Sequence, residues 1–191
     1  MSAPSDIRPF EGLIVPGPGT FTIDASHTTV GFVARHLVVS KVRGSFTEVS
    51  GTIQVAPNPL DSTVEVTIGA ASITTGQADR DNHLRSADFL ELEKYPNLVY
   101  RSTGVKSHNG NRFVLGGELT VRDVTREVDL EVEYEGTVTS PWGQEVIAFT
   151  ASTEIDREAW GITWNQALET GGVVVGKKVK IELSVEAVRS A

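Results

Sequence analysis

The chain has 191 residues, of which 39% are hydrophobic and 22% are charged, as is typical of a soluble globular protein. A net charge of −8 argues against a nucleic-acid surface and against broad attraction to anionic lipids, because both need a basic face. The absence of cysteine excludes disulfides, thiolate metal ligands and a cysteine nucleophile. No run of 18 apolar residues occurs, so we expect no membrane-spanning helix and no stable membrane insertion.

The first 18 residues are rich in proline and glycine, which predicts an irregular arm ahead of a single domain spanning residues 19–191. The opening sequence MSAPSDIRPFEG lacks a basic segment followed by an apolar one. We therefore expect no secretory signal and a cytoplasmic location.

From residue 19 onward most of the chain alternates apolar and polar residues with a period of two. The alternation is clearest over residues 64–68, 113–121, 128–134 and 179–185. Strand-like segments that recur with short turns are typical of an antiparallel sandwich or barrel. A continuous up-and-down order favours the barrel, because closure removes exposed strand edges. We expect an all-β fold, an antiparallel barrel of about eight strands.

One segment, ADRDNHLRSADFLELEKYP at residues 78–96, breaks this pattern and predicts a short helical insert. Pro96 disfavours helix at the residue before it, so the insert should end there. Two roles are compatible with its composition. It can be a polar plug that closes the barrel, or a lid whose arginine and histidine side chains meet the polar end of a ligand.

Small residues stand in several strands where a filled core would need leucine or phenylalanine. They are Gly31, Gly44, Gly51, Gly69, Ala70, Ala71, Gly116 and Gly117. One explanation is that they form bulges and tight bends in strongly curved strands. The other is an open apolar lumen, since an eight-stranded barrel either fills itself or encloses one small ligand.

Signals for catalysis or metal binding are weak. The four histidines show neither a helical i, i+4 spacing nor an HxH spacing, and no GxSxG, GxGxxG or phosphate-binding glycine motif is present. We therefore expect no catalytic residue, no metal and no required cofactor.

Several collinear motifs resemble the YceI family of polyisoprenoid-binding proteins. They are FTIDASHTTVGFVARHL (21–37), VRGSFTEVSGTI (42–53), RDNHLRSADFLELEKYP (80–96), LVYRS (98–102), GELTVRDVTREVDLEV (117–132), DREAWGITWN (156–165) and GKKVKIEL (176–183). The resemblance implies an extended lipocalin-like barrel that holds a long isoprenoid, such as a polyprenyl phosphate or an isoprenoid quinone. Family members are often periplasmic, and the expected absence of a signal peptide departs from that.

Candidate contact residues follow from placing an isoprenoid tail in the lumen and its polar end at a mouth. The head-group candidates are the donors of the insert and two early-strand neighbours: His27, Arg35, Arg80, His83 and Arg85. The lumen candidates are larger apolar residues: Phe32, Phe46, Val66, Ile68, Phe89, Tyr100, Leu119, Leu130, Val132 and Trp164.

Three functions remain open. The first is non-enzymatic binding of the isoprenoid for storage, carriage or protection. The second is an enzyme acting on such a lipid, with His83 as general acid–base and Arg80 stabilising charge. The third is a stress-related structural barrel without ligand. The expected partner is thus a hydrophobic small molecule and no nucleic acid, and the sequence leaves a homodimer open.

Overall fold

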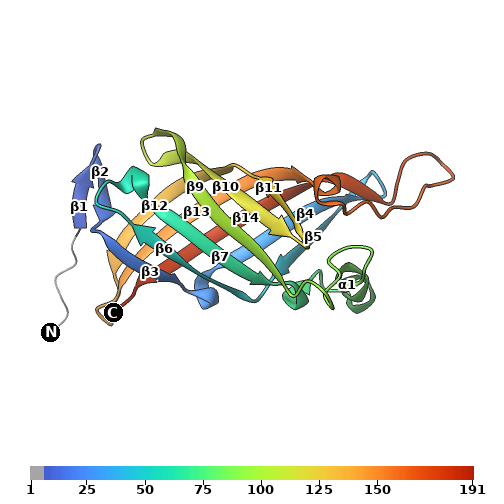
Figure 1. The fold of residues 1–191 in the computed structure, drawn as a ribbon, viewed down its shortest axis with the longest axis horizontal. Helices are drawn as coiled ribbons and strands as arrows, with labels where there is room; N and C mark the ends of the chain where they lie inside the picture. The colour runs from blue at the N-terminus through green and yellow to red at the C-terminus, as the bar shows by residue number, and fades with distance from the viewer. Residues whose placement is uncertain (1–6) are drawn as a thin grey trace.

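The computed structural model describes residues 7–191 (Figure 1). The strands are β1 (Ile7–Phe10), β2 (Leu13–Pro16), β3 (Gly19–Ile23), β4 (Thr29–His36), β5 (Ser40–Phe46), β6 (Val49–Val55), β7 (Thr63–Gly69), β8 (Ile73–Thr74), β9 (Asn97–Asn109), β10 (Arg112–Val121), β11 (Val124–Glu127), β12 (Leu130–Thr139), β13 (Glu145–Asp156) and β14 (Val175–Arg189). The helical elements are α1 (Ala78–Arg85) and the short 3-10 turns η1 (Ala25–His27), η2 (Pro59–Asp61), η3 (Ala70–Ser72) and η4 (Arg157–Trp160).

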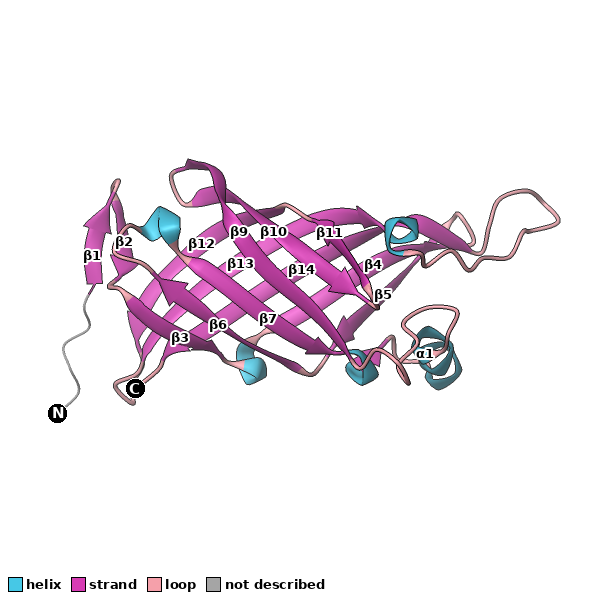
Figure 2. Ribbon diagram, viewed as in Figure 1, coloured by secondary structure: helices cyan, strands magenta, loops and turns pink. Residues whose placement is uncertain are grey.

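The main sheet closes into a barrel. β14 pairs on one side with β13 and on the other with β4 and then β3. From there the chain circles the barrel in sequence order, each strand antiparallel to the next. Bends or short breaks divide four of the strands, so that β3–β4, β5–β6, β7–β8 and β11–β12 each act as one. The predicted eight-stranded antiparallel barrel with one short helix is confirmed (Figure 2).

Alternating burial explains why these segments form the wall. In β12, Leu130, Val132 and Tyr134 are buried, whereas Glu131 and Glu135 are exposed. Because successive side chains of a strand point to opposite faces, each strand contributes an apolar row to the interior and a polar row to solvent.

The N-terminal segment differs from its prediction. Residues 1–6 lie outside the described residues, but residues 7–16 form the β1–β2 hairpin instead of an irregular arm. The hairpin is a separate two-stranded sheet, and each of its strands has a free edge where proline is tolerated. Tyr134 fixes it to the barrel by donating its hydroxyl to the Ile14 carbonyl at 3.0 Å. We call this end of the barrel the hairpin end.

The insert lies at the opposite end, the α1 end, near the long loop that follows η4 (Figure 1). Gln77 caps α1 by accepting a hydrogen bond from the Arg80 amide, and residues 86–95 continue as turns. The insert therefore contains one short helix followed by turns. Leu84, Phe89 and Leu90 point inward from it and join the main apolar cluster.

Two of the strand glycines make room for large rings. An added Cβ at Gly44 would lie 2.3 Å from the Phe32 ring, and one at Gly117 would lie 2.2 Å from the Tyr100 hydroxyl. These positions are small because a neighbouring ring occupies the space. Gly116 and Gly117 also lie at a register shift between β9 and β10, as the bulge explanation predicts.

An ion pair between a half-buried arginine and a buried glutamate joins β13 and β14, and its loss gives a first prediction. Arg189 donates to both carboxylate oxygens of Glu145, at 2.7 and 3.3 Å, and its guanidinium lies 4.6 Å from the Phe21 ring centre. Arg189→Met leaves the buried Glu145 carboxylate without its positively charged partner, so we expect the free energy of unfolding in urea to fall by about 2 kcal/mol. Arg112→Met, at the exposed pair with Glu133, should cost about 0.5 kcal/mol or less. Equal losses for the two variants would contradict this reasoning.

Candidate functional site

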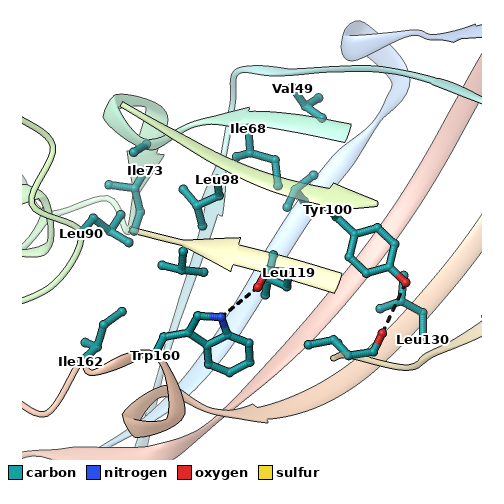
Figure 3. Close-up of a cluster of buried hydrophobic side chains, with 14 of the residues drawn as sticks. Val49, Ile68, Ile73, Leu90, Leu98, Tyr100, Leu119, Leu130, Trp160 and Ile162 are labelled. Atoms are coloured by element: carbon teal, nitrogen blue, oxygen red, sulfur yellow. Dashed lines mark hydrogen bonds between the residues drawn. The ribbon is translucent and has the colours of Figure 1, made fainter. Parts of the chain in front are cut away.

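The barrel encloses an elongated cavity of about 430 Å³. This volume lies within the range of about 300–1,000 Å³ that is usual for small-molecule sites. Its wall is almost entirely apolar and includes Ile68, Leu98, Leu119 and Leu130, whose side chains gather in Figure 3. Such a wall is chemically suited to a hydrophobic ligand.

Both ends of the cavity are covered by apolar side chains. At the hairpin end the wall includes Phe10 and Leu13 of the hairpin and Leu60 of η2. At the α1 end it includes Leu84 and Phe89 of the insert. The insert thus fits the predicted role of a plug.

Polar atoms of the deep wall are already satisfied. The Trp160 indole donates to the Leu119 carbonyl at 3.0 Å, and the Tyr100 hydroxyl lies 3.4 Å from the Val128 carbonyl (Figure 3). Burial, with a smaller contribution from the Asp129 charge, raises the pKa of Tyr100 to about 12, so the phenol stays neutral. Neither group offers charge to a ligand.

Arg157 is the exception, because it is a buried cation that lines the cavity. Its guanidinium donates to the carbonyls of Ile162 at 2.8 Å, Gly176 at 3.0 Å and Val175 at 3.3 Å. These bonds use three of its five N–H groups. Among residues 7–191 no carboxylate lies within 4 Å of it.

The two acids beside Arg157 are engaged elsewhere. Asp156 accepts from the Glu158 amide at 3.0 Å, and Glu158 pairs with Lys177 at 2.8 Å. Burial lowers the pKa of Arg157, although the guanidinium of an arginine stays protonated. A cation in this state is suited to an anionic or strongly hydrogen-bond-accepting group on a ligand, since an unpaired buried charge is costly.

Nine of the ten lumen candidates line the cavity: Phe32, Phe46, Val66, Ile68, Phe89, Tyr100, Leu119, Leu130 and Val132. Trp164 does not. Its ring packs at 4.5 Å against His83 and at 5.5 Å against Phe89, so it supports the insert from outside.

The structure does not bring the five head-group candidates together, and none of them lines the cavity. Arg80 donates to the Thr75 hydroxyl at 2.7 Å, and Arg85 donates to the carbonyls of Ala71 and Ile73 at 3.0 and 2.7 Å. His83 pairs with Asp88 at 2.8 Å. The Arg80 and Arg85 contacts hold the insert against the end of β7–β8, and the His83 pair lies within the insert. That these donors meet a ligand head group stays a prediction.

The other two candidates lie on the outer surface. Arg35 is exposed on β4, against Gly176 of β14. His27 contacts Asp24 at 2.8 Å and Glu186 at 3.7 Å. The side-chain oxygen and nitrogen atoms of Asp24, His27 and Glu186 lie within 4.8 Å of one another, which is close enough for the three residues to hold one metal ion.

The electrostatics of this cluster favour an ion pair over a metal site. The Asp24 carboxylate raises the pKa of His27 above its usual 6.5, and hydrogen bonds from Ser26 and His27 lower the pKa of Asp24 to about 2. A protonated imidazole cannot ligate a metal. The absence of a metal stays a prediction.

We expect the His27 imidazole to titrate above pH 6.5 in a histidine NMR titration, and its pKa to fall in Asp24→Asn. The raised pKa of His27 stabilises the fold below pH 6.5, and this contribution is lost as pH rises through the folded pKa. The lowered pKa of Asp24 stabilises it above pH 3.8, with loss as pH falls towards about 2. An unchanged His27 pKa in Asp24→Asn would show that the pair does not form.

Arg157 is the residue that sequence reasoning missed. It lies between two acids, and such a charged run usually marks an exposed turn. The available signal was its position in the DREAWGITWN motif, where the buried Trp160 and Ile162 follow it.

A closed eight-stranded barrel with an apolar lumen places this chain among the lipocalin-like barrel proteins with an internal site. The chain belongs to the YceI-like domain family, whose model matches residues 21–187. A UPF0312 protein of Staphylococcus epidermidis is 41% identical over 168 residues, covering 87% of this chain and 95% of that protein. A UPF0312 protein of Staphylococcus aureus is 38% identical with the same coverage.

Solved structures agree on the fold. A YceI protein of Campylobacter jejuni is 27% identical, with a TM-score of 0.69 over 82% of this chain and 90% of its own. BcnA of Burkholderia cenocepacia superposes with a TM-score of 0.75 at 19% identity, over 86% and 98%. A polyisoprenoid binding domain from Saccharophagus degradans has a TM-score of 0.69 at 14% identity, over 89% and 98%.

Proposed function

We propose that this protein binds a long-chain isoprenoid lipid in its barrel without transforming it. The observation that carries the proposal is a 430 Å³ apolar cavity whose lining includes one buried cation free of carboxylates. Each buried CH₂ group of a tail contributes about 0.8 kcal/mol, so a short run of isoprene units suffices for retention. The description of the Saccharophagus domain supports the same class of ligand.

The head group is the second part of the proposal. A phosphate or a quinone carbonyl accepts hydrogen bonds, and Arg157 has N–H groups beyond the three that its carbonyl partners use. We propose that the polar end of the lipid lies near Arg157, at the α1 end of the barrel. Storage, carriage and protection all use the same binding step.

The enzymatic alternative has less support. His83 pairs with Asp88 of the insert, Arg80 donates to Thr75 just before it, and both lie outside the cavity lining. A filled structural barrel is disfavoured by the cavity itself. No helix within residues 7–191 is long and apolar enough to span a bilayer. The cytoplasmic location stays a prediction, which cell fractionation tests.

Organic extraction of the purified full chain, followed by mass spectrometry, tests the proposal. We expect a prenyl lipid in a near-stoichiometric amount, recovered unchanged after incubation with the protein. A fatty acid or phospholipid in its place would overturn the isoprenoid assignment. Conversion of an added polyprenyl phosphate or quinone would overturn the non-enzymatic one. An empty extract combined with no uptake of either lipid would leave only the structural barrel.

A further inference from the structure

The α1 end carries an exposed apolar projection beyond the barrel wall. It consists of the β4–β5 turn, residues 37–39, and the small hairpin of residues 166–174, which we call together the tip. The Leu37 amide donates to the Val174 carbonyl at 2.9 Å, so the two segments are joined. The hairpin of the tip forms the long loop that extends farthest from the barrel in Figure 1.

Apolar side chains of the tip face solvent. Val39 is 83% exposed and Val38 is 56% exposed, and Leu37 and Val173 are exposed beside them. Val38 also has a φ of 67°, a left-handed conformation that β-branched residues rarely adopt. The turn thus presents apolar side chains where glycine or asparagine would suit the backbone better.

The strands beneath the tip are basic, in contrast to the rest of the molecule. Residues 33–43 and 166–180 contain six lysines and arginines and one acidic residue, in a chain of net charge −8. Arg35 and Lys41 are cross-strand partners on β4 and β5, and Arg35 also contacts Gly176 beside Lys178. Among the described residues, these three cations have no acidic partner within 4 Å.

A second exposed apolar site provides the contrast. Trp142, in the β12–β13 turn, is 84% exposed, but residues 131–156 around it contain no lysine or arginine and six acidic residues. Exposed apolar residues therefore occur elsewhere on the barrel, whereas their combination with unpaired cations is found at the tip.

We infer that the tip is a docking site for the surface of an anionic lipid bilayer. Apolar side chains that enter the interface, bordered by cations that meet anionic headgroups, are the features that hold a protein on such a surface. The acidic remainder of the chain keeps the other faces away from the same surface. Docking here is peripheral and requires no insertion of the barrel.

The position of the tip relates docking to the cavity. Ala34 of β4 and Val175 of β14 line the cavity, and they lie just inside the tip. A barrel docked through the tip therefore holds the α1 end of its cavity at the membrane surface. The docking proposal does not depend on which molecule the cavity holds.

Co-sedimentation of the full chain with vesicles tests this inference. We expect binding to phosphatidylcholine vesicles that contain phosphatidylglycerol, weaker binding to pure phosphatidylcholine, and loss of binding in high salt. The double variant Lys41→Glu/Lys178→Glu should weaken partitioning by about 25-fold, since each basic residue near the surface contributes about fivefold. Val39→Asp should also abolish binding, whereas Trp142→Ser should leave it unchanged.

Folding is checked on the same samples by circular dichroism, and because every altered side chain is exposed we expect native spectra. Equal binding to neutral and anionic vesicles, or loss of binding in Trp142→Ser, would overturn the inference. Absence of vesicle binding together with self-association that Val39→Asp abolishes would show that the tip is instead an interface between two copies of the chain. Lipid uptake into the cavity is measured separately, so failure of either proposal leaves the other standing.

Discussion

Ala151→Trp is expected to weaken binding of a polyprenyl lipid by about 30-fold while the barrel stays folded. Ala151 lines the cavity from β13 and pairs with Val132 and Leu183 on its neighbours. An indole there occupies space that a tail would fill, and displacing two or three CH₂ groups costs about 2 kcal/mol of binding.

Ser152→Trp is the matched control, because Ser152 is the next residue of β13 and faces outward. It should bind the lipid like the wild type. In a filled core the Ala151 substitution would instead cost about 1–3 kcal/mol of unfolding free energy through overpacking. Unchanged lipid affinity with lost stability in urea would therefore show that the cavity is not the binding site.

Arg157→Met is expected to have two large effects. It leaves the carbonyls of Ile162, Gly176 and Val175 without their donor, so the free energy of unfolding should fall by about 3 kcal/mol. It also removes the cation that we assign to the head group. The preference for polyprenyl phosphate over the bare polyprenyl hydrocarbon should then fall by about tenfold or more.

Arg85→Met separates these effects. Arg85 also donates to two backbone carbonyls at the α1 end, but it does not line the cavity. Its loss should lower stability and leave the ratio of the two affinities unchanged. If Arg157→Met weakened the binding of both lipids equally, Arg157 would act only by fixing η4 to β14.

The fold was largely predictable because the strands of a barrel wall alternate apolar and polar residues with a period of two. The alternation over residues 113–121 and 128–134 corresponds to the inward-facing side chains of the neighbouring strands β10 and β12. The hairpin of residues 7–16 was missed, because Pro9 and Pro16 indicate irregular structure unless the strands are known to form a small separate sheet.

The site was predictable in its apolar part and not in its polar part. Inward-facing strand residues such as Leu130 follow directly from alternation. The direction of side chains on a single short helix does not. The sequence therefore assigns Arg80 and Arg85 to a ligand head group, whereas in the structure their hydrogen bonds hold the insert. Arg157 is buried only because η4 folds back onto β14, a tertiary event without local periodicity.

The small strand residues also show what sequence alternation cannot predict, namely which side chains surround a given position. Gly69 and Gly117 are two of the small residues that the sequence allows to border an open lumen. However, a Cβ at Gly69 meets Glu48 at 2.8 Å, one at Gly117 meets Tyr100, and neither glycine lines the cavity. The cavity arises from the barrel's circumference together with residues such as Ala151, and alternation alone does not give that circumference.

Methyl NMR on the protein loaded with a polyprenyl lipid tests the central claim most directly. The account predicts nuclear Overhauser effects from the olefinic protons of the tail to the methyl groups of Leu119, Leu130 and Val132, which line the cavity. It predicts none to Val138, which is exposed on the outer surface. Effects confined to exposed methyl groups such as those of Val138 and Val39, with none to the lining, would contradict binding inside the barrel.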